Sequence, residues 1–409
     1  MNTLQNFWFL LKSTTYISFD KQEVVLLYNT QKGTHFETAN QQIIALIKSA
    51  QEKLNLGVCL LNGELLTDAD FSEIIQQLVE FQLIELLEID KSQPKPISLL
   101  PVLNLQKDIE KLRKDKSRSI GEGALSYLTN LNLYINSVCE QKCNSCAAFY
   151  RQIPFCTKQN VNAELSMNCI ENILQQISAS SVGRINVFGG NVLLYSKLQE
   201  LPELFQQYGV HFHFWIYYQN LSEKIEIIDN FHKDILLAFP LENDFENIFL
   251  NLRNEKTTFH FVIENEAQYI EFERFKEKYG HLNFQAQPFF NGGNIDFFRE
   301  NVFLNKEDIF ADTVPLRTIF CNQKLNSNFF GKLFVLPDGS VRANLNAEIL
   351  GNIKEKSLLE LISKELNTNT AWRKTRNETP CNECMYQYFC PPPSNYEIAT
   401  EKYYLCNIK

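Results

Sequence analysis

The sequence predicts an α/β protein built on a parallel sheet. From residue 129 to residue 310, six short strand-like runs alternate with stretches whose apolar residues recur at helical spacing. The expected strands are Leu131–Ile135, Ile185–Phe188, Phe212–Tyr217, Ile235–Phe239, Thr258–Ile263 and Asn283–Ala286, and the expected helices include Met167–Ile177, Leu198–Tyr208 and Tyr269–Tyr279. Because helices that connect successive strands make those strands parallel, this region should form an open sheet or a barrel. Ligands of such folds gather at the carboxyl ends of the strands.

Residues 1–90 are expected to form a small separate unit. Two runs rich in β-branched and aromatic residues, Tyr16–Phe19 and Val24–Tyr28, flank a polar turn and predict a hairpin. Two helices should follow, the second with Thr67 or Asp68 as its N-cap. Their apolar residues recur at helical spacing and are Ile43, Ile44, Leu46 and Ile47, then Phe71, Ile74, Ile75 and Leu78. The pattern is typical of a winged-helix-like module, and a simple packing domain is the alternative.

The rest of the chain divides by composition. Residues 91–125 are polar, with mixed charges in Lys107–Arg118, and should form a linker or an exposed helix. Residues 126–310 carry the alternating strands and helices. Residues 311–409 are rich in cysteine, with Pro and Gly in the loops, and are expected to form a third unit.

Overall composition excludes several classes of protein. The 409 residues are 44% hydrophobic and 21% charged, which is the ordinary mixture of a globular protein with a sizeable core. A formal net charge of −9 lacks the basic footprint of a nucleic-acid-binding protein. The apolar runs fall far short of the ~20 residues that a membrane span needs, and the N-terminus has no signal-peptide pattern. We therefore expect a cytoplasmic protein that binds neither nucleic acid nor membrane.

Eleven cysteines in a chain without an export signal favour metal or redox chemistry over disulfides. Cys139, Cys143 and Cys146 form a C-x3-C-x2-C motif shortly after the first expected strand. Three thiolates at this spacing can hold an iron–sulfur cluster and leave one iron open for a substrate or cofactor. The alternatives are zinc, with Cys156 as a fourth ligand, and three unrelated buried thiols.

A second cysteine set lies near the end of the chain and consists of Cys381, Cys384, Cys390 and Cys406. A C-x2-C pair with two further thiols within 26 residues predicts a bound metal or cluster. By spacing alone, a zinc site with four thiolate ligands competes with an iron–sulfur cluster.

The first motif, placed after the first strand of an α/β unit, resembles that of the radical S-adenosylmethionine (SAM) superfamily. The segment Ile185–Tyr195 is similar to the second-strand segment of that family, where Gly189 and Gly190 match the start of a Gly-Gly-Glu-Pro motif. The resemblance implies a partial (β/α)6 barrel in which the open iron binds SAM, with Gly189, Gly190 and Asn191 against the SAM amino group. Asn191 and Val192 replace the Glu and Pro of the family motif. Because Asn lacks the charge that strengthens a hydrogen bond to an ammonium group, we expect an eroded SAM pocket.

The C-terminal unit is similar to the SPASM extension of peptide-modifying radical SAM enzymes, which holds two auxiliary [4Fe–4S] clusters. The resemblance rests on Phe334–Arg342, on Leu350–Ile353 and on the second cysteine set, which would hold one auxiliary cluster. Cys321 matches the first ligand of the other cluster. Asn344 and Ser394 stand where further thiolates should be, so Cys321 is expected to be a buried thiol.

Over essentially its whole length, the chain resembles a narrower group of pseudo-radical-SAM proteins. These accompany a genuine radical SAM peptide maturase and a short precursor peptide. Trp8, the strand Val25–Thr30 and the stretch Cys384–Glu397 carry this resemblance. It implies that the N-terminal module captures a leader peptide by adding a strand to a sheet edge.

Three functions are weighed on this basis. The first is a degenerate partner that keeps its clusters, binds precursor peptide or the genuine maturase, and does not cleave SAM. Five departures from the family pattern favour it: Ser145, Asn191, Val192, Asn344 and Ser394. The second is an active maturase, favoured by the intact C-x3-C-x2-C motif, in which a 5′-deoxyadenosyl radical leads to a thioether or carbon–carbon crosslink. A zinc-stabilised scaffold explains the C-terminal cysteines but not the first motif.

Overall fold

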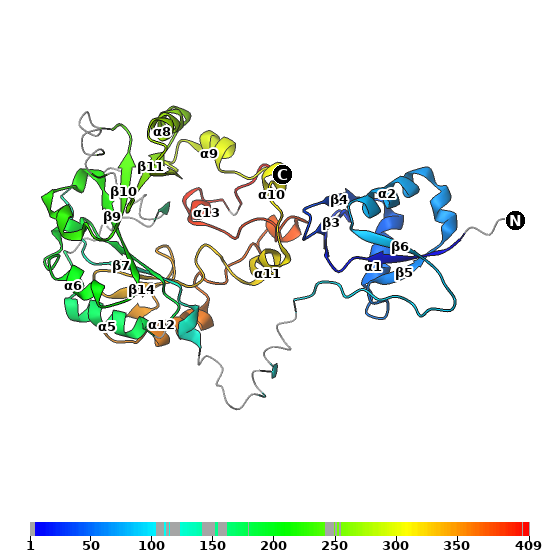
Figure 1. Ribbon diagram of the computed structural model, residues 1–409, viewed down its shortest axis with the longest axis horizontal. Coiled ribbons are helices and arrows are strands. Elements are labelled where there is room, and N and C mark those ends of the chain that lie inside the picture. Colours follow the sequence, from blue (N-terminus) through cyan, green and yellow to red (C-terminus); the bar gives the residue numbers. More distant parts are fainter. Residues whose placement is uncertain are drawn as a thin grey trace.

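The computed structural model describes residues 5–103, 110, 111, 114, 123–140, 152, 153, 162–178, 180–241, 249, 252, 255–402 and 404–408. Figure 1 shows a small lobe, which carries the first six strands, and a larger lobe built around one extended sheet. Most of Lys107–Arg118, together with Cys143, Ser145, Cys146 and Cys156, lies outside the described residues.

The small lobe consists of two three-stranded antiparallel sheets and two α-helices. Its elements are β1 (Phe7–Leu11), β2 (Thr15–Phe19), β3 (Val25–Asn29), β4 (His35–Thr38), α1 (Gln41–Gln51), β5 (Val58–Leu61), α2 (Ala69–Glu80) and β6 (Ile84–Glu88). One sheet has the order β5-β1-β6 and the other β2-β3-β4. The predicted hairpin is β2–β3, and both predicted helices are confirmed. Asp68 rather than Thr67 caps α2, because its carboxylate accepts a hydrogen bond from Phe71 N at 3.0 Å.

The large lobe is built on a nine-stranded sheet of order β12-β11-β10-β9-β8-β7-β13-β14-β15. Its strands are β7 (Asn130–Tyr134), β8 (Arg184–Phe188), β9 (His211–Tyr217), β10 (His232–Ala238), β11 (Thr257–Ile263), β12 (Asn283–Pro288), β13 (Lys332–Val335), β14 (Ser340–Arg342) and β15 (Gly351–Asn352). The seven strands from β12 to β13 run parallel, and β14 and β15 add antiparallel pairs. All six predicted strands and the α/β class with a parallel sheet are therefore confirmed. The cysteine-rich region shares this sheet, because β13 pairs with β7.

Helices pack against one face of the large sheet. They include α5 (Met167–Ile177), α6 (Leu201–Gln206), α8 (Glu266–Lys278) and α12 (Leu358–Thr368). Because side chains alternate along a strand, Ile185 and Val187 of β8 join the core beneath these helices. We call the opposite face of the sheet the inner face, and β8 presents Arg184, Asn186 and Phe188 there.

The predicted helices are found with shifted ends where a local signal sets the boundary. The predicted bounds of the helix Met167–Ile177 are those of α5, which has Ser166 as its N-cap. α6 is shorter than the predicted Leu198–Tyr208 because Pro202, which has no N–H to donate, stands in its first turn. α8 starts three residues before Tyr269 because Asn265 caps it.

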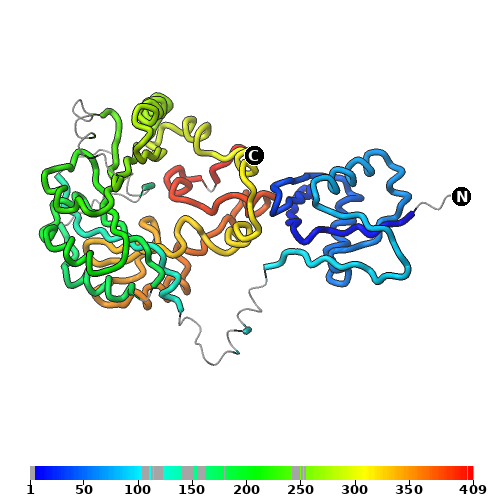
Figure 2. Tube along the Cα trace, in the orientation of Figure 1, coloured from blue at the N-terminus to red at the C-terminus, as the bar shows by residue number. Residues whose placement is uncertain are grey.

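Three short helices lie between β12 and β13: α9 (Ile295–Asn301), α10 (Lys306–Phe310) and α11 (Leu316–Lys324). A fourth, α13 (Asn395–Ala399), lies near the C-terminus. Figure 2 shows the last part of the chain, in red, running between the large sheet and the small lobe. Across the described ranges, no helix combines the length and the apolar character that crossing a bilayer demands.

Candidate functional site

The segments that follow β7 and β8 meet at the carboxyl edge of the sheet. Gly190 N donates a hydrogen bond to Asn136 O at 3.0 Å, and Asn191 N donates to Val138 O at 2.6 Å. The side-chain amide of Asn136 also donates to Asn191 O at 2.8 Å. The structure thus places the predicted Gly189–Asn191 segment beside the stretch that leads to Cys139.

Both glycines are required by this close approach. A Cβ atom on Gly189 would lie 2.2 Å from Asn136 Oδ1, and one on Gly190 would lie 2.4 Å from Val138 O. The space beside Gly190 is therefore filled by the chain's own backbone. Asn136 Oδ1 is buried and, among the described residues, has no hydrogen-bond partner, so it is an acceptor available to an amino group near Gly189.

Asn191 caps a short helical turn instead of facing a ligand. Its Oδ1 accepts a hydrogen bond from Leu193 N at 3.0 Å, and the residue is only 8% exposed. This oxygen can reach a bound amino group only if the cap breaks. The residues present therefore do not fit the charge-assisted contact to SAM that the resemblance implies at this position.

The first cysteine motif begins at an exposed residue next to this edge. Cys139 is exposed and follows Val138, which pairs with Asn191. Its two motif partners, Cys143 and Cys146, lie outside the described residues. The ligand set of the first cluster thus stays a prediction.

The second cysteine set gathers around Cys390. Burial raises the pKa of the Cys390 thiol to about 12; the charge of Arg376 opposes this rise, and the charges of the other three cysteines add to it. Asn322 of α11 fixes the loop by donating hydrogen bonds to Tyr388 O at 3.0 Å and to Cys390 O at 3.1 Å. Four neighbouring thiols are a donor set that suits iron or zinc. Among the residues that the structure describes, however, no three Cys, His, Asp or Glu side chains are arranged as a metal-binding group.

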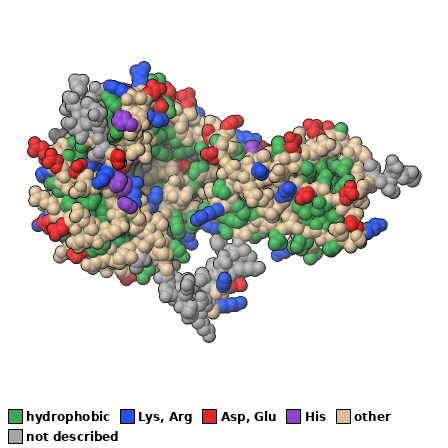
Figure 3. Space-filling model, in the orientation of Figure 1, with side chains coloured by type: hydrophobic (Ala, Val, Ile, Leu, Met, Phe, Trp, Pro, Cys, Tyr) green, Lys and Arg blue, Asp and Glu red, His purple; other side chains and the backbone are tan. Residues whose placement is uncertain are grey.

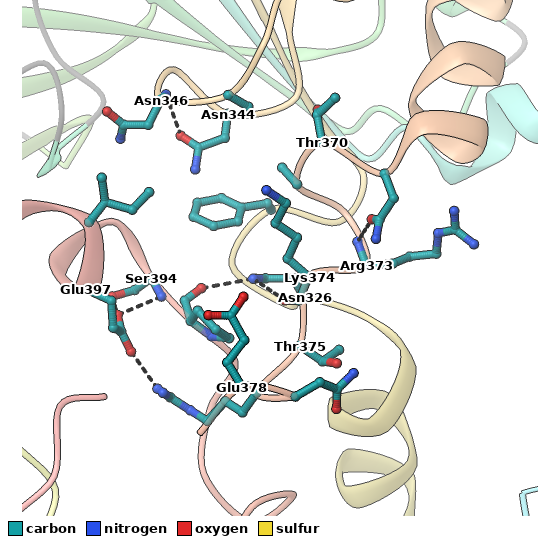
Figure 4. A pocket seen from close by; sticks show the side chains of 18 of the residues that line it. Asn326, Asn344, Asn346, Thr370, Arg373, Lys374, Thr375, Glu378, Ser394 and Glu397 are labelled. Atoms are coloured by element: carbon teal, nitrogen blue, oxygen red, sulfur yellow. Dashed lines mark hydrogen bonds and ion pairs between the residues drawn. The ribbon is translucent and has the colours of Figure 1, made fainter. Parts of the chain in front are cut away.

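A pocket of about 610 Å³ is lined by both positions where the resemblance implies lost cluster ligands (Figure 4). Asn344 donates a hydrogen bond to Asn395 Oδ1 at 2.9 Å. The Ser394 hydroxyl donates to Glu397 within the capping box of α13. Both side chains are therefore committed to bonds within the chain. Cys321, expected to be a buried thiol, is instead partly exposed on α11.

The inner face carries a polar network centred on Asp234, which no motif in the sequence marks. The Asp234 carboxylate of β10 accepts hydrogen bonds from His213 Nδ1 at 3.0 Å and from His260 Nε2 at 2.8 Å, and Arg184 lies 3.4 Å away. Burial by itself raises the pKa of this carboxyl group, but the bonds from the two histidines and the nearby positive charges outweigh it, and the pKa falls to about 2. The signal in the sequence was a polar residue at alternate positions, His211 and His213 in β9 and Thr258 and His260 in β11.

The loop of the second cysteine set also contacts the small lobe. Tyr386 Oη donates to Glu37 Oε1 of β4 at 2.8 Å, and Lys306 Nζ pairs with Glu37 Oε2 at 2.8 Å. Tyr28 of β3 packs edge-to-face on Phe389, with ring centroids 4.8 Å apart. The small lobe therefore rests on the segment that carries the cysteines.

The fold and these sites define a mixed α/β protein with a large, mainly parallel sheet, a glycine-lined strand edge and a cysteine-rich C-terminal region. Among solved structures, the chain is similar to crystal structures of SuiB from Streptococcus suis. SuiB bound to S-adenosylmethionine shares 11% identity, with 98% of this chain and 99% of that chain covered and a TM-score of 0.43. SuiB bound to precursor peptide SuiA shares 13% identity, with 97% and 98% covered and a TM-score of 0.45. No family model matches the sequence, and no curated protein matches it.

Proposed function

We propose that this chain is a radical-SAM/SPASM-like iron–sulfur protein of a ribosomal peptide maturation system, acting as a degenerate partner. In this role it binds precursor peptide, a genuine radical SAM maturase, or both, in the cytoplasm, without efficient SAM cleavage. The observation that carries the proposal is the orientation of Asn191, whose Oδ1 caps Leu193 N. A side chain that should contact the SAM amino group is committed to the protein's own backbone.

The proposal assigns one task to each part of the chain. Residues 126–310 form the radical-SAM-like partial barrel and residues 311–409 the SPASM-like unit, while residues 91–125 link them to a peptide-recognition module at residues 1–90. Strand β4 ends one sheet of the small lobe and lies against α10 of the large lobe. The contact is made by His35, which stacks on Phe310 with ring centroids 3.9 Å apart. Strand β6 ends the other sheet, and we place peptide addition at that edge.

Two cysteine sets would hold the clusters. The first motif would hold one [4Fe–4S] cluster and the second set an auxiliary one, and both clusters would supply electron-transfer or ligand-binding iron. The electrostatic effect of the other three cysteines on the pKa of Cys390 supports the second assignment. Iron content distinguishes this proposal from the zinc scaffold.

Cys384→Ala should remove about one cluster's iron from anaerobically reconstituted protein, because a cluster with three remaining thiolates is held less tightly. Iron and zinc are counted by elemental analysis against protein concentration. Cys169→Ala on α5, outside both sets, is the matched control and should keep its iron. An unchanged iron count in Cys384→Ala would disprove the auxiliary cluster, and zinc in place of iron would leave only the scaffold.

SAM binding tests the degenerate site directly. Asn191→Glu should tighten SAM binding roughly ten- to a hundred-fold, because a charge-assisted hydrogen bond contributes ~1.5–3 kcal/mol. Calorimetry measures the affinity, and mass spectrometry follows 5′-deoxyadenosine in the reduced, reconstituted protein. Asn191→Gln, which adds length without charge, is the control.

The wild-type protein should form no 5′-deoxyadenosine. Its formation would identify an active maturase and overturn the degenerate role. If SAM binds Asn191→Glu and the wild type equally well, the Gly189–Asn191 segment does not face SAM, and its assignment to the family motif is wrong.

A further inference from the structure

The amino edge of the inner face carries a row of donor side chains. Lys332 of β13, Asn130 of β7, Arg184 of β8 and His211 of β9 are partners in register on four neighbouring parallel strands. Neighbouring strands are about 4.8 Å apart, so three adjacent side chains of this length can converge on one small ligand. The row lies at the opposite end of β8 from Gly189, five residues or roughly 16 Å away at about 3.3 Å per residue.

Three of these side chains have donor groups to spare among the contacts of the described residues. Asn186 Nδ2 donates to Asn130 Oδ1 at 3.2 Å, which orients the Asn130 amide, and its NH2 group has no hydrogen-bond acceptor in the part of the chain that the structure describes. Arg184 donates through Nε to Asn186 Oδ1 at 2.8 Å, and its side chain is 41% exposed. The Lys332 ammonium group has no ion pair or hydrogen bond with any described residue, although the side chain is half-buried.

The charge balance at the row leaves one positive charge. Lys332 and Arg184 contribute two positive charges, and Asp234 contributes one negative charge through its contact with Arg184. Burial, and then the charge of Arg184, lower the pKa of Lys332, as expected for cations that face each other without a full set of counter-ions. Burial and the charges of His213 and His211 lower the pKa of His232 as well. One negative charge from a ligand balances the charge that remains on this pair of cations.

We propose that Lys332, Asn130 and Arg184 form a binding site for one carboxylate group. A carboxylate offers two oxygens in a plane to the amide, ammonium and guanidinium donors, and its single charge balances the row. A phosphate dianion would leave an excess negative charge beside the buried Asp234 carboxylate. The carboxylate belongs either to a free organic acid or to an acidic residue of a peptide.

Histidine resonances of the full-length protein report on the site. The chain has six histidines, so ¹⁵N-histidine labelling gives a countable spectrum. Sodium acetate and an N-acetyl-glutamate amide are titrated at constant ionic strength, with sodium chloride as the reference salt. The signals of His211, His213 and His232 should shift and saturate, while those of His35 and His281 should not.

Substitutions connect these shifts to the row. Lys332→Gln and Arg184→Gln should each weaken binding at least tenfold, whereas Lys332→Arg should retain it. Lys197→Gln, on the same lobe and exposed, is the control and should leave the affinity unchanged. Thermal unfolding of each variant verifies that it is folded.

Three results would overturn the proposal. Equal histidine shifts with sodium chloride would mean that the effect comes from ionic strength alone. Tighter binding of phosphate than of acetate would exclude a carboxylate as the ligand. An unchanged acetate affinity in folded Lys332→Gln would mean that Lys332 does not contact the ligand. Both probes support the site if they bind. A tenfold preference for the glutamate probe would identify a peptide as the source of the carboxylate, and equal affinity a free acid.

Discussion

At the residue scale, Asp234 is a buried carboxylate that its hydrogen bonds with His213 and His260 keep ionised. Its pKa of about 2, compared with the ordinary value of 3.8, means that folding favours the ionised carboxylate. A group with a lowered folded-state pKa stabilises the protein above its unfolded pKa, and that stabilisation is lost as the pH falls toward the folded value. At about 1.4 kcal/mol per pKa unit, the contribution is about 2 kcal/mol at pH 7.

Asp234→Asn should therefore lower the free energy of unfolding by about 2 kcal/mol at pH 7. The asparagine amide is uncharged and has one acceptor oxygen, so it cannot accept charge-assisted hydrogen bonds from both histidines. The difference from the wild type should shrink as the pH falls from about 4 toward 2. Urea denaturation at pH 7, 5 and 3 measures it. Asp296→Asn, whose carboxylate is 84% exposed beside Arg299, is the control and should change stability little at any pH. A constant difference between pH 7 and pH 3 would contradict this account of Asp234.

At the element scale, the sequence was most informative where periodicity was strong. The six strands between residues 129 and 310 were predicted because short runs rich in apolar, β-branched and aromatic residues alternate with stretches of helical periodicity. Strand β13 was not predicted to join them, because pairing between segments about 200 residues apart leaves no local signal. Helix ends shifted where a single residue, such as Pro202 or Asn265, outweighed the apolar pattern.

The site was predictable only as a list of residues. Gly189 and Gly190 could be found by motif, and the structure adds that the neighbouring segment around Asn136 and Val138 leaves no room for a Cβ. The sequence could not show that Asn191 turns inward, because the cap depends on where the helical turn after it begins. Nor could it show that Asp234 and His260, 26 residues apart, share a hydrogen bond.

At the scale of the whole molecule, the small lobe contacts residues 384–390 and α10 through a group of side chains centred on Glu37, which we call the joint. This carboxylate accepts from Tyr386 and pairs with Lys306, and burial followed by the bond to Glu37 raises the pKa of Tyr386. Tyr16 Oη adds a contact by accepting from Gln323 Nε2 at 3.0 Å. The sheet β2-β3-β4 of the small lobe is thus the one that contacts the segment carrying the second cysteine set.

Glu37→Ala should loosen this joint while leaving each lobe folded, because the lost contacts connect the lobes and lie outside the core of either. Hydrogen bonds to a charged group contribute roughly 1.5–3 kcal/mol, so amide hydrogen exchange in β3, β4 and residues 384–390 should accelerate about ten- to a hundred-fold. Exchange in β8–β10 should stay as in the wild type. Glu85→Ala, on the exposed side of β6, is the matched control and should leave the joint unchanged. Unchanged exchange in Glu37→Ala would mean that the aromatic packing of Tyr28 and Phe389 holds the lobes together without the charged contacts.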